Sequence, residues 1–148
     1  NILLLLLFPI AMSAQNHQKY NWRRPAVAAG ISFGSGAAWG LNQVLEHRNA
    51  NFFRVFPNAN RRFWGPDSWK NKYVGFDPEN GRRKMPVWFT DGKHLTASIA
   101  QVGAFSAGVT IAIGEKRPFK HYVFDGLISL GAYSLGNFVV WDVIFKNK

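Results

Sequence analysis

The chain contains no cysteine and few acidic residues. Without cysteine it can form no disulfide, bind no zinc through thiolates and use no thiol nucleophile. It also has no HExxH zinc motif, no phosphate-binding glycine-rich loop and no Ser-His-Asp arrangement. Its 8 Asp and Glu stand against 18 Lys and Arg, which gives the 148 residues a formal net charge of +10. This excess of positive charge favours an anionic partner, either lipid headgroups or nucleic acid.

Formal charges are nearly missing from three long runs, at residues 25–45, 95–114 and 122–145. The first two carry none, and the third carries only Asp125 and Asp142, near its two ends. An α-helix rises ~1.5 Å per residue, so about 20 residues cross the ~30 Å hydrocarbon core of a bilayer. The sequence therefore predicts an all-α fold, a small membrane bundle of three spanning helices. The alternative for the first run is a buried helix of a soluble protein.

A shorter apolar run, ILLLLLFPIAMSA, occupies residues 2–14 and ends in small residues before Gln15. It is too short to span a bilayer comfortably and is typical of a secretory signal peptide. We expect residues 1–14 to be cleaved off, which leaves residues 15–148 as a single membrane domain. The alternative is a retained anchor helix.

Residues 46–93 join the first two long runs and carry ten of the eighteen Lys and Arg, interleaved with aromatic side chains. Pro57, Pro66, Pro78 and Pro86 cut this segment into pieces too short for a long helix. Such a composition predicts an ordered lid at the headgroup level, with rings inserted and cations directed toward phosphates. The residues expected at the lipid interface are Trp64, Trp69, Lys70, Lys72, Tyr73, Arg82, Arg83 and Lys84.

Local spacing predicts two details of the lid. Trp69 and Tyr73 are four residues apart and should share one face of a short helix, while Lys70 and Lys72 should point elsewhere, toward phosphate. The pair Asn80-Gly81 predicts a tight turn.

The expected spans also carry packing signals. Gly30 and Gly34, and then Gly36 and Gly40, repeat at the four-residue spacing that allows helices to approach closely. One face of the second span gathers polar side chains, which should point into the bundle rather than at lipid. Its members are His94, Ser98, Gln101, Phe105 and Gly108.

The distribution of Lys and Arg predicts an orientation. Cleavage of the signal peptide would leave the new amino end outside, so that the lid and the carboxyl end lie in the cytoplasm. The cytoplasmic segments then hold twelve of the eighteen Lys and Arg, as the positive-inside rule requires. We therefore expect a multi-pass protein of a bacterial inner membrane.

The most distinctive stretch reads FWGPDSWKNKY and is followed by Asp-Pro, Asn-Gly and TDGKH. It resembles the FWxPxSWKNKY and TDxxH signature of small, uncharacterised integral membrane proteins of Bacteroidota. The resemblance covers residues 20–145 and implies a membrane location, but it carries over no activity and no site residue. Phe76 stands where that pattern has Gly before the Asp-Pro pair.

Polar residues near the ends of the spans are the candidates for chemistry. Carboxylate and imidazole groups toward the cytoplasmic side could hold a divalent transition metal such as zinc, iron or manganese. The candidate ligands are Glu46, His47, Asp91, His94 and Asp142. The alternative is structural: Asp91, or Thr90 beside it, caps a helix, and Glu46 and His47 meet headgroups or lid cations.

Candidate catalytic residues are Asp91, His94, His121 and Asp125. His121 and Asp125 fall at the end opposite to the others, four apart on one helical face. Their HYVFDG context resembles the final HxxxD motif of membrane lipid phosphatases of the phosphatidic acid phosphatase type. The preceding PSGH motif of those enzymes is missing, so a His-Asp pair that orients the start of the helix is favoured.

These observations leave two functional hypotheses. The first is a non-enzymatic accessory or scaffold subunit without a cofactor, which binds anionic lipid and associates with other membrane helices or with further copies of itself. The second is a metal-assisted membrane enzyme that acts on a lipid-like substrate at the cytoplasmic interface. Nucleic acid is the less favoured partner, because a lid beside spanning helices meets the anionic inner leaflet first.

Overall fold

The computed structural model describes residues 20–83 and 87–146, and within them the chain forms helices and no strand. Three long helices run the length of the molecule: α2 (Arg23–His47), α5 (Gly92–Ala112) and α6 (Phe119–Phe138). A π-helical segment, η5 (Val139–Ile144), continues α6. The prediction of an all-α fold is confirmed. The expected signal peptide and Lys84 lie outside the described residues.

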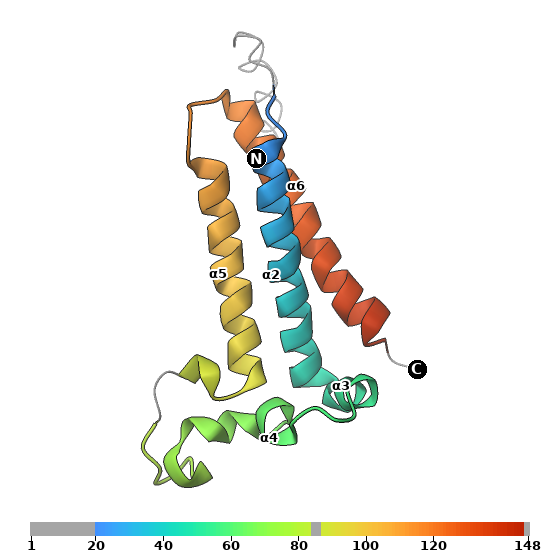
Figure 1. Ribbon diagram of the computed structural model, residues 1–148, viewed down its shortest axis with the longest axis vertical. Helices are drawn as coiled ribbons and strands as arrows, with labels where there is room; N and C mark the ends of the chain where they lie inside the picture. Colours follow the sequence, from blue (N-terminus) through green and yellow to red (C-terminus); the bar gives the residue numbers. More distant parts are fainter. Residues whose placement is uncertain (1–19, 84–86, 147–148) are drawn as a thin grey trace, which may run out of the picture.

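The helix α2 is the central element of the bundle (Figure 1). It packs along both α5 and α6, whereas those two helices contact each other much less. The helices begin two or three residues before the uncharged runs, because capping and polar residues extend a helix beyond its apolar part. The helix α5 ends early, at Ala112, and Gly114 with a φ of 110° then starts the turn toward α6.

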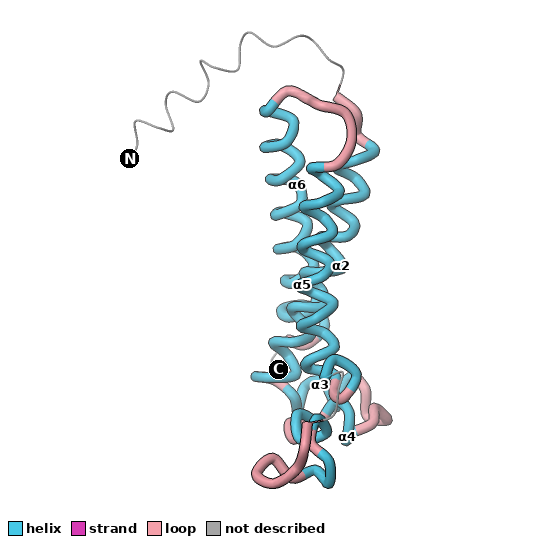
Figure 2. The backbone as a smooth tube through the Cα atoms, turned by 90° about the vertical axis from the view of Figure 1, so that its left-hand side faces the viewer, coloured by secondary structure: helices cyan, strands magenta, loops and turns pink. Residues whose placement is uncertain are grey.

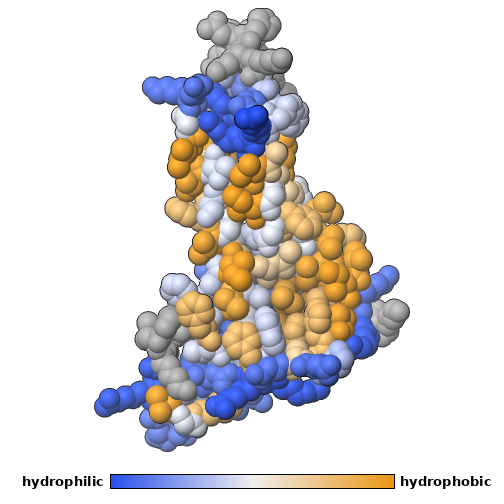
Figure 3. Space-filling model, in the orientation of Figure 1, coloured by the Kyte–Doolittle hydropathy of each residue, from blue (hydrophilic) through white to orange (hydrophobic). Residues whose placement is uncertain are grey.

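Two of the three helices are long and apolar enough to cross a membrane: α5, and α6 together with η5 over Phe119–Ile144. The helix α2 has the required length but is not among these candidates, because Gly, Ser, Asn and Gln dilute its apolar residues. A space-filling view shows apolar surface over the middle of the bundle and hydrophilic surface at both ends (Figure 3). The helix α2 is therefore the least apolar of the three, and it is the one that packs against both α5 and α6.

The contact between α2 and α6 depends on glycine. A Cβ at Gly36 would collide with the backbone of Tyr133, and one at Gly136 would collide with the backbone of Phe33. Gly40 faces Asn137 in the same contact. The close approach expected of Gly36 and Gly40 is therefore confirmed.

Gly30 and Gly34 do not take part in the contact between α2 and α6. A Cβ at Gly30 or at Gly34 would meet nothing within 4 Å. These two residues face away from both neighbouring helices, so the prediction that they mediate helix contact within this chain is wrong.

The face of α5 that meets α2 consists of small residues. The Ser35 hydroxyl donates a hydrogen bond to the Ala100 carbonyl, and Gly103 lies against Ser35. Thr96 and Ala107 are buried on the same face. The polar face predicted to point inward is wrong in its carboxyl-terminal part, because Gln101 and Gly108 are exposed and Phe105 is 74% exposed. Small side chains let two backbones approach, and that close packing decides which face turns inward.

The lid consists of short helical pieces laid across one end of the bundle (Figure 2). They are α3 (Asn49–Val55), α4 (Arg61–Trp64), η2 (Ser68–Lys72), η3 (Val74–Phe76) and η4 (Val87–Phe89). Side-chain amides join these pieces: Asn49 donates to the Trp64 carbonyl at 2.9 Å, and Asn71 exchanges hydrogen bonds with Arg62. The prediction of short pieces is confirmed.

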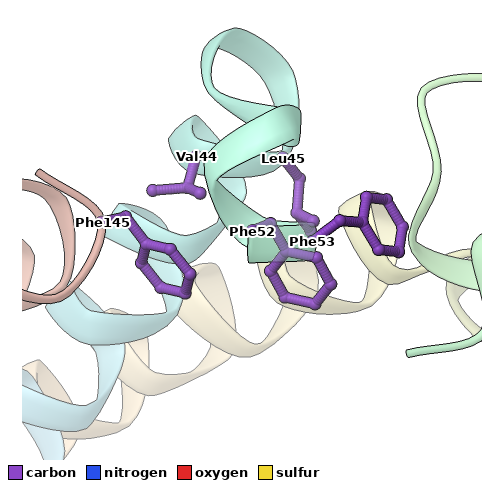
Figure 4. Packing of buried hydrophobic residues seen from close by; sticks show 5 residues of the cluster. All are labelled: Val44, Leu45, Phe52, Phe53 and Phe145. Atoms are coloured by element: carbon purple, nitrogen blue, oxygen red, sulfur yellow. The ribbon is translucent and has the colours of Figure 1, made fainter. Parts of the chain in front are cut away.

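A cluster of buried apolar residues lies where the lid meets the bundle (Figure 4). Val44 and Leu45 from the last turn of α2 meet Phe52 and Phe53 from α3, and Phe145 from the end of the chain joins them. Trp64 packs against this cluster at its edge, with its ring centroid 5.3 Å from that of Phe52. The cluster therefore fixes α3 and the carboxyl end to the base of α2.

Candidate functional site

The outer face of the lid is rich in cations that lack an acidic partner. Among the described residues, the lid cations that pair with a carboxylate are Lys70, with Asp67, and Lys93, with Glu46, both at 2.9 Å. The remaining Lys and Arg bond to carbonyls or amides, lie over rings or project from the surface. They are Arg48, Arg54, Arg61, Arg62, Lys72, Arg82 and Arg83. This face carries a net positive charge at the end of the bundle.

The aromatic rings and the lysines of η2, together with Tyr73 directly after it, form one cluster rather than two separate faces. Trp69 and Tyr73 meet edge to face with centroids 6.3 Å apart, which confirms that they lie together. The Lys72 ammonium lies 5.4 Å from the centroid of each ring, and Lys70 lies 5.8 Å from that of Trp69. The prediction that both lysines point away from the rings is wrong, because a cation is attracted to the face of an aromatic ring.

The tip of the lid is a compact turn. The Asp77 side chain accepts hydrogen bonds from the backbone N–H groups of Glu79 and Asn80, and Gly81 N–H donates to the Asp77 carbonyl. The bond from the Glu79 backbone, followed by those from the Asn80 side chain and backbone, holds the pKa of Asp77 below its usual range. The tight turn at Asn80-Gly81 is confirmed. Arg82 and Arg83, directly after it, are exposed.

At the lid end of α5, Asp91 and His94 form a hydrogen-bonded pair. Asp91 is fully buried and caps the helix by accepting from the His94 backbone N–H at 2.8 Å. Its second oxygen lies 2.7 Å from His94 Nδ1 and accepts from the Thr90 hydroxyl. The predicted cap is confirmed. The buried carboxylate also orients an imidazole whose side chain is 38% exposed.

The candidate metal ligands do not converge. Within the described residues, no group of three or more His, Cys, Asp or Glu side chains is placed to hold a metal ion. Glu46 is engaged by Lys93, whose hydrogen bond lowers the pKa of that carboxyl, while His47 lies beside the Trp141 ring and Asp142 is exposed. Only Asp91 and His94 of the five come together.

A buried ion pair closes the opposite end of the bundle. Asp125 is fully buried, accepts from Arg117 at 2.6 Å and also accepts from the Tyr20 hydroxyl. Burial, followed by the hydrogen bond to Asp125, raises the pKa of Tyr20 to about 12. His121 contacts the edge of the Tyr20 ring, with centroids 5.0 Å apart. Asp125 therefore orients the start of α6 through Tyr20 and Arg117, whereas His121 contributes ring packing.

Sequence reasoning missed Arg117 and Tyr20 as partners of Asp125. A carboxylate inside an otherwise apolar helix needs a cation, and Arg117 is one of the nearest in the sequence. This need for a cation is the feature of the sequence from which the pairing of Arg117 with Asp125 could have been predicted. The guanidinium also donates to the Ile111 carbonyl at 2.9 Å and lies over the Tyr122 ring, so it holds the connection between α5 and α6 in place.

A groove of about 490 Å³ opens where α2 meets the lid. We call it the lid groove, and it is lined mainly by Leu41, Phe52, Val55, Phe56, Ala59 and Trp64. Its wall is largely apolar, and Phe56 is 48% exposed at its rim.

The lid groove and the cationic lid face are neighbours on the same end of the molecule. Together they offer positive charge and apolar volume, which suits an amphipathic anion better than a small polar substrate. No family model, no curated protein and no solved structure matches the chain.

Proposed function

We propose that this protein is a non-enzymatic component of a bacterial inner membrane that binds anionic lipid through its lid. In this proposal all three long helices span the bilayer, with α2 shielded by the more apolar α5 and α6. The chain belongs to the small Bacteroidota membrane proteins that its FWGPDSWKNKY stretch resembles.

The single observation that carries the proposal is the set of lid cations without carboxylate partners. Five of them, Arg54, Arg61, Arg62, Arg82 and Arg83, are exposed. Trp88 and Phe89 add exposed rings at 56% and 68%. Rings at the headgroup level with cations directed to phosphate are what an anionic leaflet attracts, at ~1 kcal/mol per cation near the surface.

The arrangement of the segments in the bundle supports the same assignment. The lid and the carboxyl end lie together at one end, and the connection between α5 and α6 lies at the other (Figure 1). With the lid in the cytoplasm, the segment richest in Lys and Arg faces the leaflet that carries anionic lipid.

Association with other membrane helices is the second part of the proposal. Gly30 and Gly34 leave the uncovered face of α2 flat, because a Cβ at either position would meet nothing within 4 Å. A helix of another subunit, or of a second copy, could approach this face closely.

The test of lipid binding uses the full chain, immobilised in a neutral detergent, and labelled phosphatidylglycerol or phosphatidylcholine. Wild-type protein should retain more phosphatidylglycerol, and the difference should shrink as salt is raised. Replacing Arg82 and Arg83 by Gln should weaken that preference by about thirtyfold at low salt, as two cations of ~1 kcal/mol each imply.

The matched control removes two cations from the opposite end, by Lys116→Gln and Lys120→Gln. It should leave the preference unchanged. Equal retention of the two lipids by the wild type would overturn the proposal, and so would an equal loss in the control.

A further inference from the structure

We propose that the lid groove seats one acyl chain of an anionic phospholipid, whose phosphate is bound by Arg54 and Arg61. This inference rests on the proposed function and deepens it, because it replaces a general attraction to the leaflet by a defined site for one lipid molecule.

The first argument is the position of Arg54 and Arg61 in the chain, on either side of the groove wall. Arg54 and Arg61 flank the chain segment, Val55 to Ala59, that supplies much of the groove wall. Both are exposed, and among the described residues neither forms an ion pair with a carboxylate. Arg54 donates to the Lys146 carbonyl at 3.0 Å, and the Arg61 guanidinium lies 4.4 Å from the centroid of the Phe53 ring. Both retain donors for a phosphate, which a guanidinium binds through paired N–H groups.

The second argument is the volume and the chemistry of the groove. About 490 Å³ lined by Leu41, Phe52, Phe56 and Trp64 fits a flexible hydrocarbon chain. In a bilayer an apolar groove gains little from the hydrophobic effect, because the surrounding lipid is equally apolar, and close packing of the chain supplies the attraction. The apolar wall therefore holds a chain, while the cations select the headgroup.

The third argument is that the face of α2 that carries Leu41 stays open beyond the groove. Leu41 shares one face of α2 with Gly34 and Gly30, because their spacing returns to the same side of a helix. This face covers ~16 Å at 1.5 Å per residue, and a Cβ at either glycine would meet nothing within 4 Å. Where no second helix occupies this face, the part of the acyl chain beyond the groove can lie along it toward the middle of the membrane.

The experiment measures retention of phosphatidylglycerol on immobilised full-length protein in neutral detergent, with octanoyl and palmitoyl chains compared. Phosphatidylcholine with the same chains and glycerol phosphate alone are the reference ligands. Wild type should prefer the longer chain and should retain glycerol phosphate poorly. Ala59→Trp, which fills the groove, should lower retention of the long-chain lipid by about tenfold and remove the preference for chain length.

The matched control is Ala104→Trp, which adds the same ring to an exposed position on α5 and should change nothing. Ala59→Cys provides a second route if the bulky ring prevents folding. The chain has no native cysteine, so this thiol can be alkylated with a bulky maleimide after folding, and the adduct should act as Ala59→Trp does.

The outcomes separate the two proposals. If wild type prefers phosphatidylglycerol but neither groove-filling variant alters the dependence on chain length, the acyl-chain site is wrong and the proposed function stands. If wild type retains the two headgroups equally, the proposed function fails as well. Stronger retention of the long-chain lipid after the groove is filled would also overturn the inference.

Discussion

Phe76 has a φ of 66°, in the left-handed region that glycine adopts without strain. It follows Gly75, which has a φ of 76°, so the chain makes two successive left-handed steps between η3 and the Asp77 turn. Glycine would remove the strain of this backbone conformation, and the Arg62 guanidinium lies 5.6 Å from the centroid of the Phe76 ring.

The corresponding prediction compares two substitutions that both remove the ring. Phe76→Gly should be more stable to unfolding than Phe76→Ala by about 1 kcal/mol, because alanine keeps the Cβ that strains a left-handed residue. Chemical unfolding of both variants in detergent provides the measurement. Equal stability would show that the left-handed conformation is not held in the folded protein.

Asp125 supports a second prediction at this scale. Asp125→Asn leaves the Arg117 guanidinium, whose side chain is 7% exposed, without its counter-charge, and should lower the free energy of unfolding by about 3 kcal/mol. Adding Arg117→Gln should restore part of the loss, because the uncompensated cation is then gone. Asp142→Asn makes the same chemical change on the exposed surface of η5 and should cost little. If the double variant is no more stable than Asp125→Asn alone, the charge pair is not the reason for the loss.

At the scale of elements, the glycines of α2 fall into two classes. Gly36→Ala places a methyl group against the Tyr133 backbone and should destabilise the contact between α2 and α6 by on the order of 2 kcal/mol. Gly34→Ala meets open space and should raise the stability by about 0.5 kcal/mol, since alanine favours a helix. Thermal unfolding of the two variants, two residues apart on one helix, is the measurement. Similar behaviour of the pair would contradict the packing of α2 on α6.

The attachment of the lid supports a second prediction about elements. Phe52 is 4% exposed and contacts four other rings, so Phe52→Ala should cost about 3 kcal/mol. Trp69 is only half-buried, and Trp69→Ala should cost about 1 kcal/mol. The comparison uses the same unfolding assay. A larger loss for Trp69 than for Phe52 would place the anchor of the lid in η2 rather than in α3.

At the scale of the whole molecule, the orientation in the membrane can be tested with introduced cysteines, since the chain has none. A cysteine at Asn80, on the exposed tip of the lid, should be shielded from a membrane-impermeant thiol reagent in intact cells and labelled once the cells are opened. A cysteine at Asn16, before α2, should be labelled in intact cells. Ser68 is unsuitable for this assay because it is 5% exposed and would be protected in either orientation. Labelling at Asn80 in intact cells would reverse the proposed topology.

The sequence by itself determined the class of fold, the positions of the three long helices, the division of the lid by proline and the Asp91 cap. Each of these depends on residues that are neighbours within one continuous segment of the chain. Examples are a run without charges, a proline that cannot donate a hydrogen bond, and a carboxylate beside free N–H groups. Interactions of this kind are visible in a single sequence because no distant partner is needed to define them.

Only the tertiary structure decided which faces meet and which polar groups pair. Gly36 packs while Gly30 does not, and Gln101 faces outward, because the choice depends on the surface that a neighbouring helix offers. Lys93 engages Glu46, and the expected metal ligands do not converge among the described residues. At the other end of the bundle, Arg117 and Tyr20 engage Asp125. Such pairings are set by distances between elements far apart in the chain, and periodicity within one element carries no information about them.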